Sequence, residues 1–108
     1  MKKGDIVLVP FPFTDLQGAK NRPALVLFES ELDVTACFLT TQLHWKEDTD
    51  LDLTPDELNG LKKASLVKLN KIATLDKRLL LGMLGKVGER ELSEVDEKLI
   101  RLLQIKIH

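Results

Sequence analysis

The sequence predicts a mainly β protein, a small antiparallel β-barrel with a terminal helix. Short apolar segments rich in β-branched residues recur along the chain, separated by polar or glycine-containing turns. The only long helical pattern lies near the C-terminus, so strands do not alternate with helices as they do in a parallel α/β sheet. A length of 108 residues suits one hydrophobic core, so we expect residues 1–108 to form a single domain.

Three strands are expected in the first half of the chain. Residues 5–9 are apolar at every position but the first, as in a central or barrel strand. The two prolines that follow should end this strand, because proline lacks the N–H that a central ladder needs. A polar loop is expected over residues 14–22, followed by strands at residues 23–28 and 34–40.

The middle of the chain predicts a short strand and a helical turn. Residues 51–53 alternate between apolar and polar side chains, as a strand does. Thr54 can cap a helix, and a proline and two acids follow it, which is typical of a helix start. Gly60 should end this helix after about one turn.

Two more strands and a helix complete the prediction. The strand at residues 65–72 has alternating faces: Val67 and Leu69 on one, Lys68 and Asn70 on the other. A strand at residues 79–87 contains two glycines that suggest a bend or a bulge. A capping box at Ser93 starts the helix at residues 93–103, and helical spacing relates its apolar residues: Leu92, Val95, Leu99 and Leu102.

Composition excludes several classes of protein. Apolar residues make up 44% and charged residues 31% of the chain, so it can bury a core and is not a disordered protein. No apolar stretch approaches the roughly 18 residues that span a bilayer, and no secretory signal is recognisable. The single cysteine, Cys37, cannot form an internal disulfide. The cytoplasm is therefore the expected compartment.

Charge is unevenly distributed although the net charge is only −1. Residues 44–59 contain one basic and six acidic residues, whereas residues 60–90 contain eight basic and two acidic ones. Such a basic block can bind phosphates. It can equally form an ordinary solvated surface once the chain folds.

Several catalytic chemistries find no support in the sequence. There is no glycine-rich phosphate loop and no pair of histidines or cysteines at the spacing of metal ligands. Cys37 lies inside an apolar strand, where a buried structural thiol is expected rather than a nucleophile. A hydrolase of this kind could still act on RNA, whose 2′-hydroxyl is a nucleophile already attached to the substrate.

Four motifs, in order, carry a resemblance to a known family. They are Gly4-Asp5-Ile6-Val7, Arg22-Pro23-Ala24-Leu25-Val26, Leu39-Thr40-Thr41-Gln42 and Ile72-Ala73-Thr74-Leu75-Asp76-Lys77. With the terminal helix that contains Val95-Asp96, they resemble the MazF/PemK (Kid) family of toxin ribonucleases over nearly the whole chain. The first two motifs are the most specific.

The resemblance implies a fold, an activity and partners. Members of that family are homodimers with an SH3-like β-barrel, and they cleave single-stranded RNA, often mRNA, without a metal or other cofactor. The products carry 2′,3′-cyclic phosphate and 5′-hydroxyl ends, and a cognate antitoxin blocks the groove. The resemblance places the catalytic arginine at Arg22 and the catalytic hydroxyl at Thr40.

Side-chain chemistry agrees with these two assignments. A guanidinium stays charged and offers a planar fork to phosphate oxygens, which suits Arg22 to a developing phosphorane. Thr41 is the alternative hydroxyl, and strand alternation places Thr40 and Thr41 on opposite faces, so only one of them can face the substrate.

The chain departs from the family where protons are transferred. The plasmid Kid branch has a histidine in the loop before Arg-Pro and an Arg-x-Asp pair on the fourth long strand. Here that loop contains no histidine, and the strand carries Lys68 and Asn70. Asparagine cannot act as a general base, so the acid and base remain unassigned.

The RNA-binding residues implied by the resemblance are Lys20, Gln42, Lys68, Asn70 and Lys71. We expect Lys68 to hold a phosphate and Asn70 and Lys71 to contact base edges. The chromosomal MazF branch has a Glu-Gln pair where this chain has Asn70-Lys71, so its sequence preference should differ.

Two alternatives to the ribonuclease remain open. The same barrel resembles CcdB-type toxins, which bind gyrase and cleave nothing. A non-catalytic RNA-binding relative would keep the groove without proton transfer. Arg22 and Thr40 favour the ribonuclease, because a gyrase-binding protein needs neither.

Overall fold

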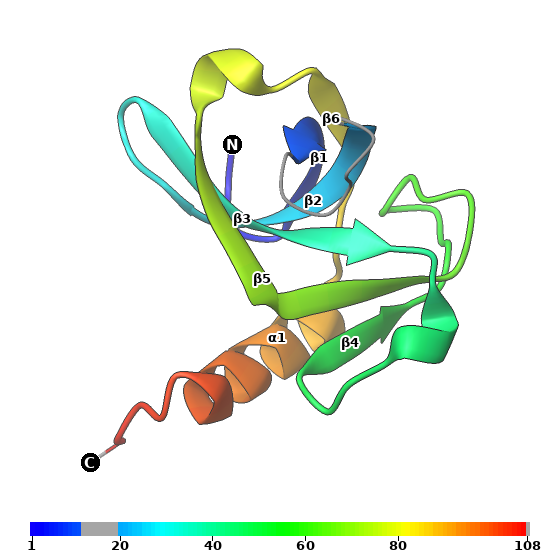
Figure 1. Ribbon diagram of the computed structural model, residues 1–108, viewed down its shortest axis with the longest axis vertical. Coiled ribbons are helices and arrows are strands. Elements are labelled where there is room, and N and C mark those ends of the chain that lie inside the picture. Colours follow the sequence, from blue (N-terminus) through cyan, green and yellow to red (C-terminus); the bar gives the residue numbers. More distant parts are fainter. Residues whose placement is uncertain (12–19, 108) are drawn as a thin grey trace.

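A curled sheet of six antiparallel strands forms the body of the molecule in this computed structural model, which describes residues 1–11 and 20–107. The strands are β1 (Asp5–Phe11), β2 (Lys20–Glu29), β3 (Asp33–Thr40), β4 (Asp50–Leu53), β5 (Ser65–Asp76) and β6 (Gly82–Lys86). Their order across the sheet is β4-β5-β3-β2-β1-β6. The strongly bent β5 curls the sheet into a half-barrel, as predicted (Figure 1).

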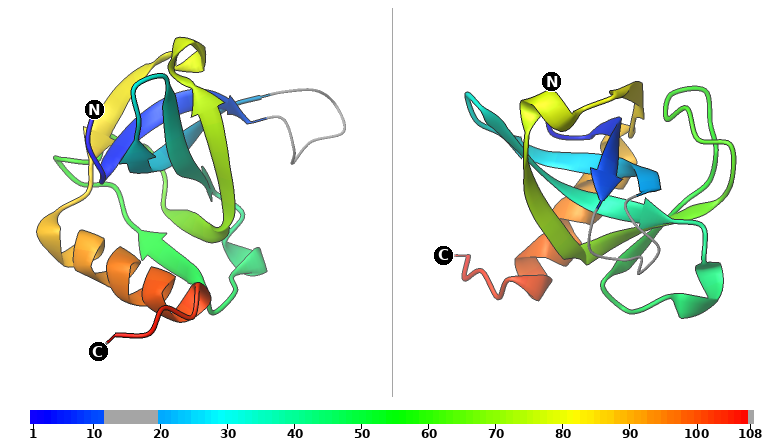
Figure 2. Two further views of the ribbon diagram at one scale, coloured as in Figure 1. Left: turned by 90° about the vertical axis from the view of Figure 1, so that its left-hand side faces the viewer. Right: turned by 45° about the horizontal axis from the view of Figure 1, so that its top comes forward.

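One α-helix, α1 (Glu89–Leu102), lies against the outside of this curl, alongside β4 and β5 (Figure 2). Two single turns of 3-10 helix complete the described elements: η1 (Leu43–Trp45) and η2 (Lys77–Leu79). No helix among the described residues is long and apolar enough to cross a membrane.

Apolar residues pack on both faces of the sheet, as the pattern of residues 5–9 predicts. Ile6 belongs to the cluster between the sheet and α1, which includes Val95 of the helix. Its neighbours Val7 and Val9 belong to the cluster on the other face. The predicted face of β3 is confirmed, because three alternating residues lie together in this second cluster: Val34, Ala36 and Phe38.

β1 is longer than predicted. It continues through Pro10 and Phe11, which pair with β2, whereas its pairing with β6 stops at Leu8. Beyond Leu8, no described strand pairs with this side of β1, and there the missing N–H of a proline removes no ladder hydrogen bond. The predicted loop is correspondingly shorter, because β2 already begins at Lys20.

The predicted helix after Thr54 is absent, and a hydrogen-bonded turn takes its place. Asp56 Oδ1 accepts hydrogen bonds from the N–H groups of Leu58 and Asn59, which competes with helix formation. Gly60 has φ +67°, and a Cβ there would lie 2.0 Å from the carbonyl oxygen of Leu84. This glycine serves the close approach of the turn to β6.

The terminal helix begins earlier than predicted. Its N-cap is Gly88 rather than Ser93, which lies inside α1. The apolar stripe is confirmed, because Val95 is buried in the core and the other three residues pack around it: Leu92, Leu99 and Leu102. The predicted irregularity of β6 is also confirmed, since its pairing with β1 shifts register between Gly85 and Met83.

Candidate active site

A groove of about 660 Å³ opens along β2, β3 and β5 beside η1. Its lining combines three cations, a hydroxyl, an amide, two aromatic rings and a carboxylate: Arg22, Phe38, Thr40, Gln42, Trp45, Glu47, Lys68 and Lys71. Both predicted catalytic residues and three of the five predicted RNA-binding residues therefore line one cavity.

Strand pairing explains how Arg22 and Thr40 come together. Ala24 of β2 pairs with Phe38 of β3 in the antiparallel register. Arg22 lies two residues before Ala24 and Thr40 two residues after Phe38, so both side chains project on the same face of the sheet. The alternation that buries apolar side chains in the core thus also places the side chains of Arg22 and Thr40 in the groove.

Arg22 lies inside a strand rather than at the junction of loop and strand. It pairs with Val9 of β1, and its guanidinium carbon lies 5.8 Å from the centre of the Phe38 ring, which is cation–π geometry. Its Nε is buried, and no hydrogen-bond acceptor reaches it among the described residues. The guanidinium is thus held over the ring and can still donate to an anion in the groove.

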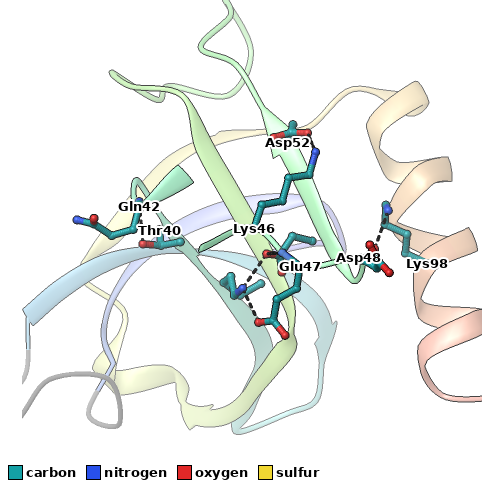
Figure 3. Close-up of polar contacts among 9 residues, drawn as sticks. Thr40, Gln42, Lys46, Glu47, Asp48, Asp52 and Lys98 are labelled. Atoms are coloured by element: carbon teal, nitrogen blue, oxygen red, sulfur yellow. Dashed lines mark hydrogen bonds and ion pairs between the residues drawn. The ribbon is translucent and has the colours of Figure 1, made fainter. Parts of the chain in front are cut away.

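The structure separates the two adjacent threonines. Thr40 lines the groove and is 8% exposed, and its Oγ1 accepts a hydrogen bond of 3.1 Å from the backbone N–H of Gln42 (Figure 3). Thr41 instead lines a second hollow, together with Pro23 and Leu84. Thr40 is therefore the hydroxyl that faces the groove.

Lys68 differs from the expectation of a free cation for phosphate. It is only 4% exposed, and its Nζ donates hydrogen bonds to Asp50 Oδ2 at 2.7 Å and to Glu47 Oε1 at 2.9 Å. Burial alone would lower the pKa of Lys68, but these two carboxylates raise it above its ordinary value of 10.5. The charge of Lys68 is therefore already paired within the protein, and its role in holding a phosphate stays a prediction.

A break in the alternation of β5 accounts for this burial. Cys37 of β3 pairs with Ile72, whereas Leu39, two residues further, pairs with Val67. Between these two pairs, β3 moves on by two residues and β5 by five. Residues 68–71 of β5 therefore form a bulge in its pairing with β3. Lys68 is buried with Val67 instead of lying on an opposite exposed face, and it pairs with Asp50 of β4.

The other predicted RNA-binding residues are placed as follows. Gln42 is exposed in the groove lining, and Lys71 lines the groove from the bulge of β5. Asn70 is exposed beside Lys71 and does not itself line the groove. Lys20 is the first residue of β2, where its backbone pairs with Phe11, and its side chain lies outside the described part of the protein.

Glu47 is a groove residue that the sequence did not reveal. Its side chain is 55% exposed, and one carboxylate oxygen binds Lys68 (Figure 3). That hydrogen bond and the positive charge of Lys68 hold the pKa of Glu47 below its ordinary value of 4.5, with smaller contributions from Asn70 and Lys71. Glu47 is therefore an ionised carboxylate in the groove at neutral pH.

Trp45 is the second unexpected residue. It is the single tryptophan of the chain, lines the groove and is 65% exposed. The ring of His44 lies 5.0 Å away at an interplanar angle of 59°. An exposed indole beside cations is a surface on which an unpaired base can stack. Sequence reasoning overlooked it because η1 has no helical or strand periodicity.

Cys37 is buried, as expected for a structural thiol. Burial raises the pKa of its thiol to about 12, so it is protonated at neutral pH. No group of three or more His, Cys, Asp or Glu side chains within residues 1–11 and 20–107 could hold a metal ion.

The basic residues of the block at 60–90 are partly paired with acids in the folded protein. Four of its eight cations form ion pairs with nearby acids: Lys68, Lys77, Arg78 and Arg90. Two others, Lys62 and Lys63, line the second hollow. This distribution favours the interpretation of the block as ordinary solvated and paired charge.

Comparisons with known proteins place the chain among toxins. Residues 2–103 match the model of the family described as PemK-like, MazF-like toxin of type II toxin–antitoxin system. No curated protein sequence matches the chain.

Solved structures share the fold over almost the whole chain. A MazE–MazF structure from Deinococcus radiodurans is 26% identical to this chain and has a TM-score of 0.77. The match covers 98% of this chain and 97% of the chain in that structure. A mycobacterial endoribonuclease in complex with its cognate antitoxin is 22% identical and has a TM-score of 0.74. The match covers 100% of this chain and 97% of the chain in that structure. The Mycobacterium tuberculosis toxin MazF-mt6 is 19% identical and has a TM-score of 0.74. The match covers 95% of this chain and 99% of the chain in that structure. The chain belongs to the PemK-like, MazF-like family of type II toxin–antitoxin toxins.

Proposed function

We propose that this toxin is a metal-independent endoribonuclease that cleaves single-stranded RNA, including mRNA. The observation that carries the proposal is the groove that holds Arg22 and Thr40 on one face of the sheet. Structural neighbours described as endoribonucleases support it.

The chemistry asks little of the protein beyond positioning and charge. The 2′-oxygen of the RNA attacks the adjacent phosphorus, and the bond from phosphorus to the 5′-oxygen breaks, which leaves a 2′,3′-cyclic phosphate and a 5′-hydroxyl. Arg22 stabilises the charge that builds on the phosphate oxygens through its fork of N–H donors. Thr40 Oγ1 accepts its backbone hydrogen bond, so its O–H can donate to the same phosphate.

Other groove residues would hold the strand. Trp45 offers a stacking surface for an unpaired base, and Lys71 and Gln42 offer donors to phosphate or base edges. A single strand suits this groove because its bases are free to stack and to present their edges.

Incubation of the purified protein with a long single-stranded RNA in EDTA, followed by mapping of the new ends, tests the proposal. We expect cuts that carry 2′,3′-cyclic phosphate and 5′-hydroxyl ends. Intact RNA with measurable RNA binding would favour a non-catalytic relative, and intact RNA with gyrase binding would favour a CcdB-like toxin. Cleavage that appears only when metal is restored would contradict the metal-independent mechanism.

We expect Asn70→Ala and Lys71→Ala to change which sites are cut. Both residues lie at the bulge of β5 beside the groove, and contacts to base edges select sequence by roughly 1–3 kcal/mol for each good pair, if they resemble DNA readout. Sequencing of the cleavage ends measures the preference, with Lys86→Ala, an exposed lysine of β6, as the control. An unchanged preference with only a slower rate would show that neither residue reads sequence.

We further propose that the toxin acts in the cytoplasm, is neutralised by a cognate antitoxin and forms a homodimer. Complexes of structural neighbours with antitoxins support the second point. The homodimer is supported by size, because a small domain gains stability from subunit contacts. β6 also exposes apolar side chains that could form such a contact: Met83 is 59% exposed and Leu84 39%. Light scattering should give twice the chain mass of 12.2 kDa, and a value near 12.2 kDa at micromolar concentration would contradict it.

A further inference from the structure

We propose that Glu47 is the general base that removes the proton of the RNA 2′-hydroxyl. This inference rests on the proposed ribonuclease function and supplies the proton acceptor that the sequence leaves unassigned. In the step, the 2′-oxygen forms its bond to phosphorus as its proton passes to Glu47. The bond from phosphorus to the 5′-oxygen breaks, and that oxygen takes a proton from solvent.

Position is the first argument. Glu47 supplies the only carboxylate in the lining of the groove among the described residues, and it shares that lining with Arg22 and Thr40. A base must reach the proton that it removes, so a carboxylate elsewhere on the surface cannot act. Asn70, at the position where the Kid branch has an aspartate, has no basic group.

Accessibility separates Glu47 from its neighbour Asp50. Both carboxylates bind Lys68 Nζ, but the side chain of Asp50 is 0% exposed, whereas that of Glu47 is 55% exposed. Asp50 Oδ2 also accepts the backbone N–H of Glu47 at 2.8 Å. Asp50 therefore fixes both the lysine and the loop, and Glu47 is the exposed member of the cluster.

Lys68 orients the carboxylate of Glu47 and leaves it ionised. Its Nζ binds Glu47 Oε1 at 2.9 Å and fixes one end of the carboxylate, while the side chain of Glu47 stays 55% exposed to the groove. Among the residues that the structure describes, the charged groups that face Glu47 include Lys68 and Lys71 of β5, Asp50 of β4 and, in the same groove, Arg22 of β2. The pKa of Glu47 lies below 4.5, so the basic form is fully populated at neutral pH.

Three variants test the inference by single-turnover cleavage. We expect Glu47→Gln to lower the cleavage rate about 10²–10⁴-fold, the usual contribution of general acid–base catalysis. Glu47→Asp keeps a carboxylate and should lose less. Asp48→Asn removes a neighbouring exposed carboxylate that does not line the groove, and it should cleave at the wild-type rate.

Binding and pH dependence separate a base from a residue that only positions Lys68. Glu47→Gln removes a negative charge from the groove, so binding of a non-cleavable 2′-deoxy analogue should be as tight or tighter. The wild-type rate should fall as the pH drops through the lowered pKa of Glu47, below 4.5, and this acid limb should vanish in Glu47→Gln.

Each outcome has a clear meaning. Rapid cleavage by Glu47→Gln, or a slow variant that retains the acid limb, overturns the role of Glu47 and leaves the ribonuclease intact. Wild-type protein that leaves RNA uncut overturns the proposed function and this inference together. Unfolding temperatures of the variants show whether a loss of rate reflects a loss of fold.

Discussion

Replacement of Arg22 by alanine is expected to lower RNA cleavage about 10²–10³-fold, the cost of removing one donor aimed at developing charge. The guanidinium lies over the Phe38 ring in the groove, with a buried Nε that has no acceptor among the described residues. A phosphorane there would gain donors that are already in place, so their loss should slow the chemical step more than it weakens RNA binding.

Arg22→Lys and Arg101→Ala complete this test. Lysine keeps the positive charge but not the planar fork, so Arg22→Lys should also be slow. Arg101 is exposed on α1, outside the groove lining, and its removal should leave the rate unchanged. Loss of the contact with Phe38 should cost only about 0.5–1 kcal/mol of stability. An Arg22→Ala protein that cleaves at the wild-type rate would move the active site elsewhere.

Replacement of Lys68 by alanine is expected to destabilise the fold by about 3–5 kcal/mol, because it leaves the buried carboxylate of Asp50 without a counter-charge. The pKa of Glu47 lies below its ordinary value of 4.5 and that of Lys68 above 10.5, so these two side chains are both charged throughout the neutral range. The stability that Lys68 contributes should be present below its unfolded pKa and be lost as the pH rises through its raised folded pKa.

Urea unfolding measures this loss, and a double variant identifies its cause. Lys68→Met combined with Asp50→Asn removes both charges while keeping an acceptor for the backbone N–H of Glu47, so it should recover part of the stability. Lys62→Ala, at an exposed lysine, serves as the control. A loss for Lys68→Ala of about 0–1 kcal/mol, the value of a surface pair, would contradict the buried cluster.

The spacing of apolar residues predicted most of the fold, because this spacing follows directly from which face of a strand or helix is buried. Alternation identified the face that carries Val34, Ala36 and Phe38, and helical spacing identified the stripe around Val95. The errors arose at a local turn and at a sheet edge. Asp56 closes a turn in place of a helix, and the open edge of β1 admits Pro10.

The candidate site was predictable where it follows regular strands. Arg22 and Thr40 share a face because β2 and β3 pair in an undistorted register beside them. The burial of Lys68 was not predicted, because it depends on a bulge of β5 against β3, and a mismatch between strands distant in sequence leaves no local signal. Trp45 ends the single 3-10 turn η1 and Glu47 lies in the loop after it, so only the folded structure shows that they line the groove.

Removal of a single hydroxyl from the substrate tests the central claim, that RNA supplies its own nucleophile in this groove. The measurement compares an RNA with the same RNA that carries one 2′-deoxyribose immediately 5′ of a mapped cut. We expect cleavage of that bond to stop while cuts at other sites continue. Cleavage of the modified bond at an unchanged rate would show that the nucleophile is water or a protein side chain, and would contradict the account.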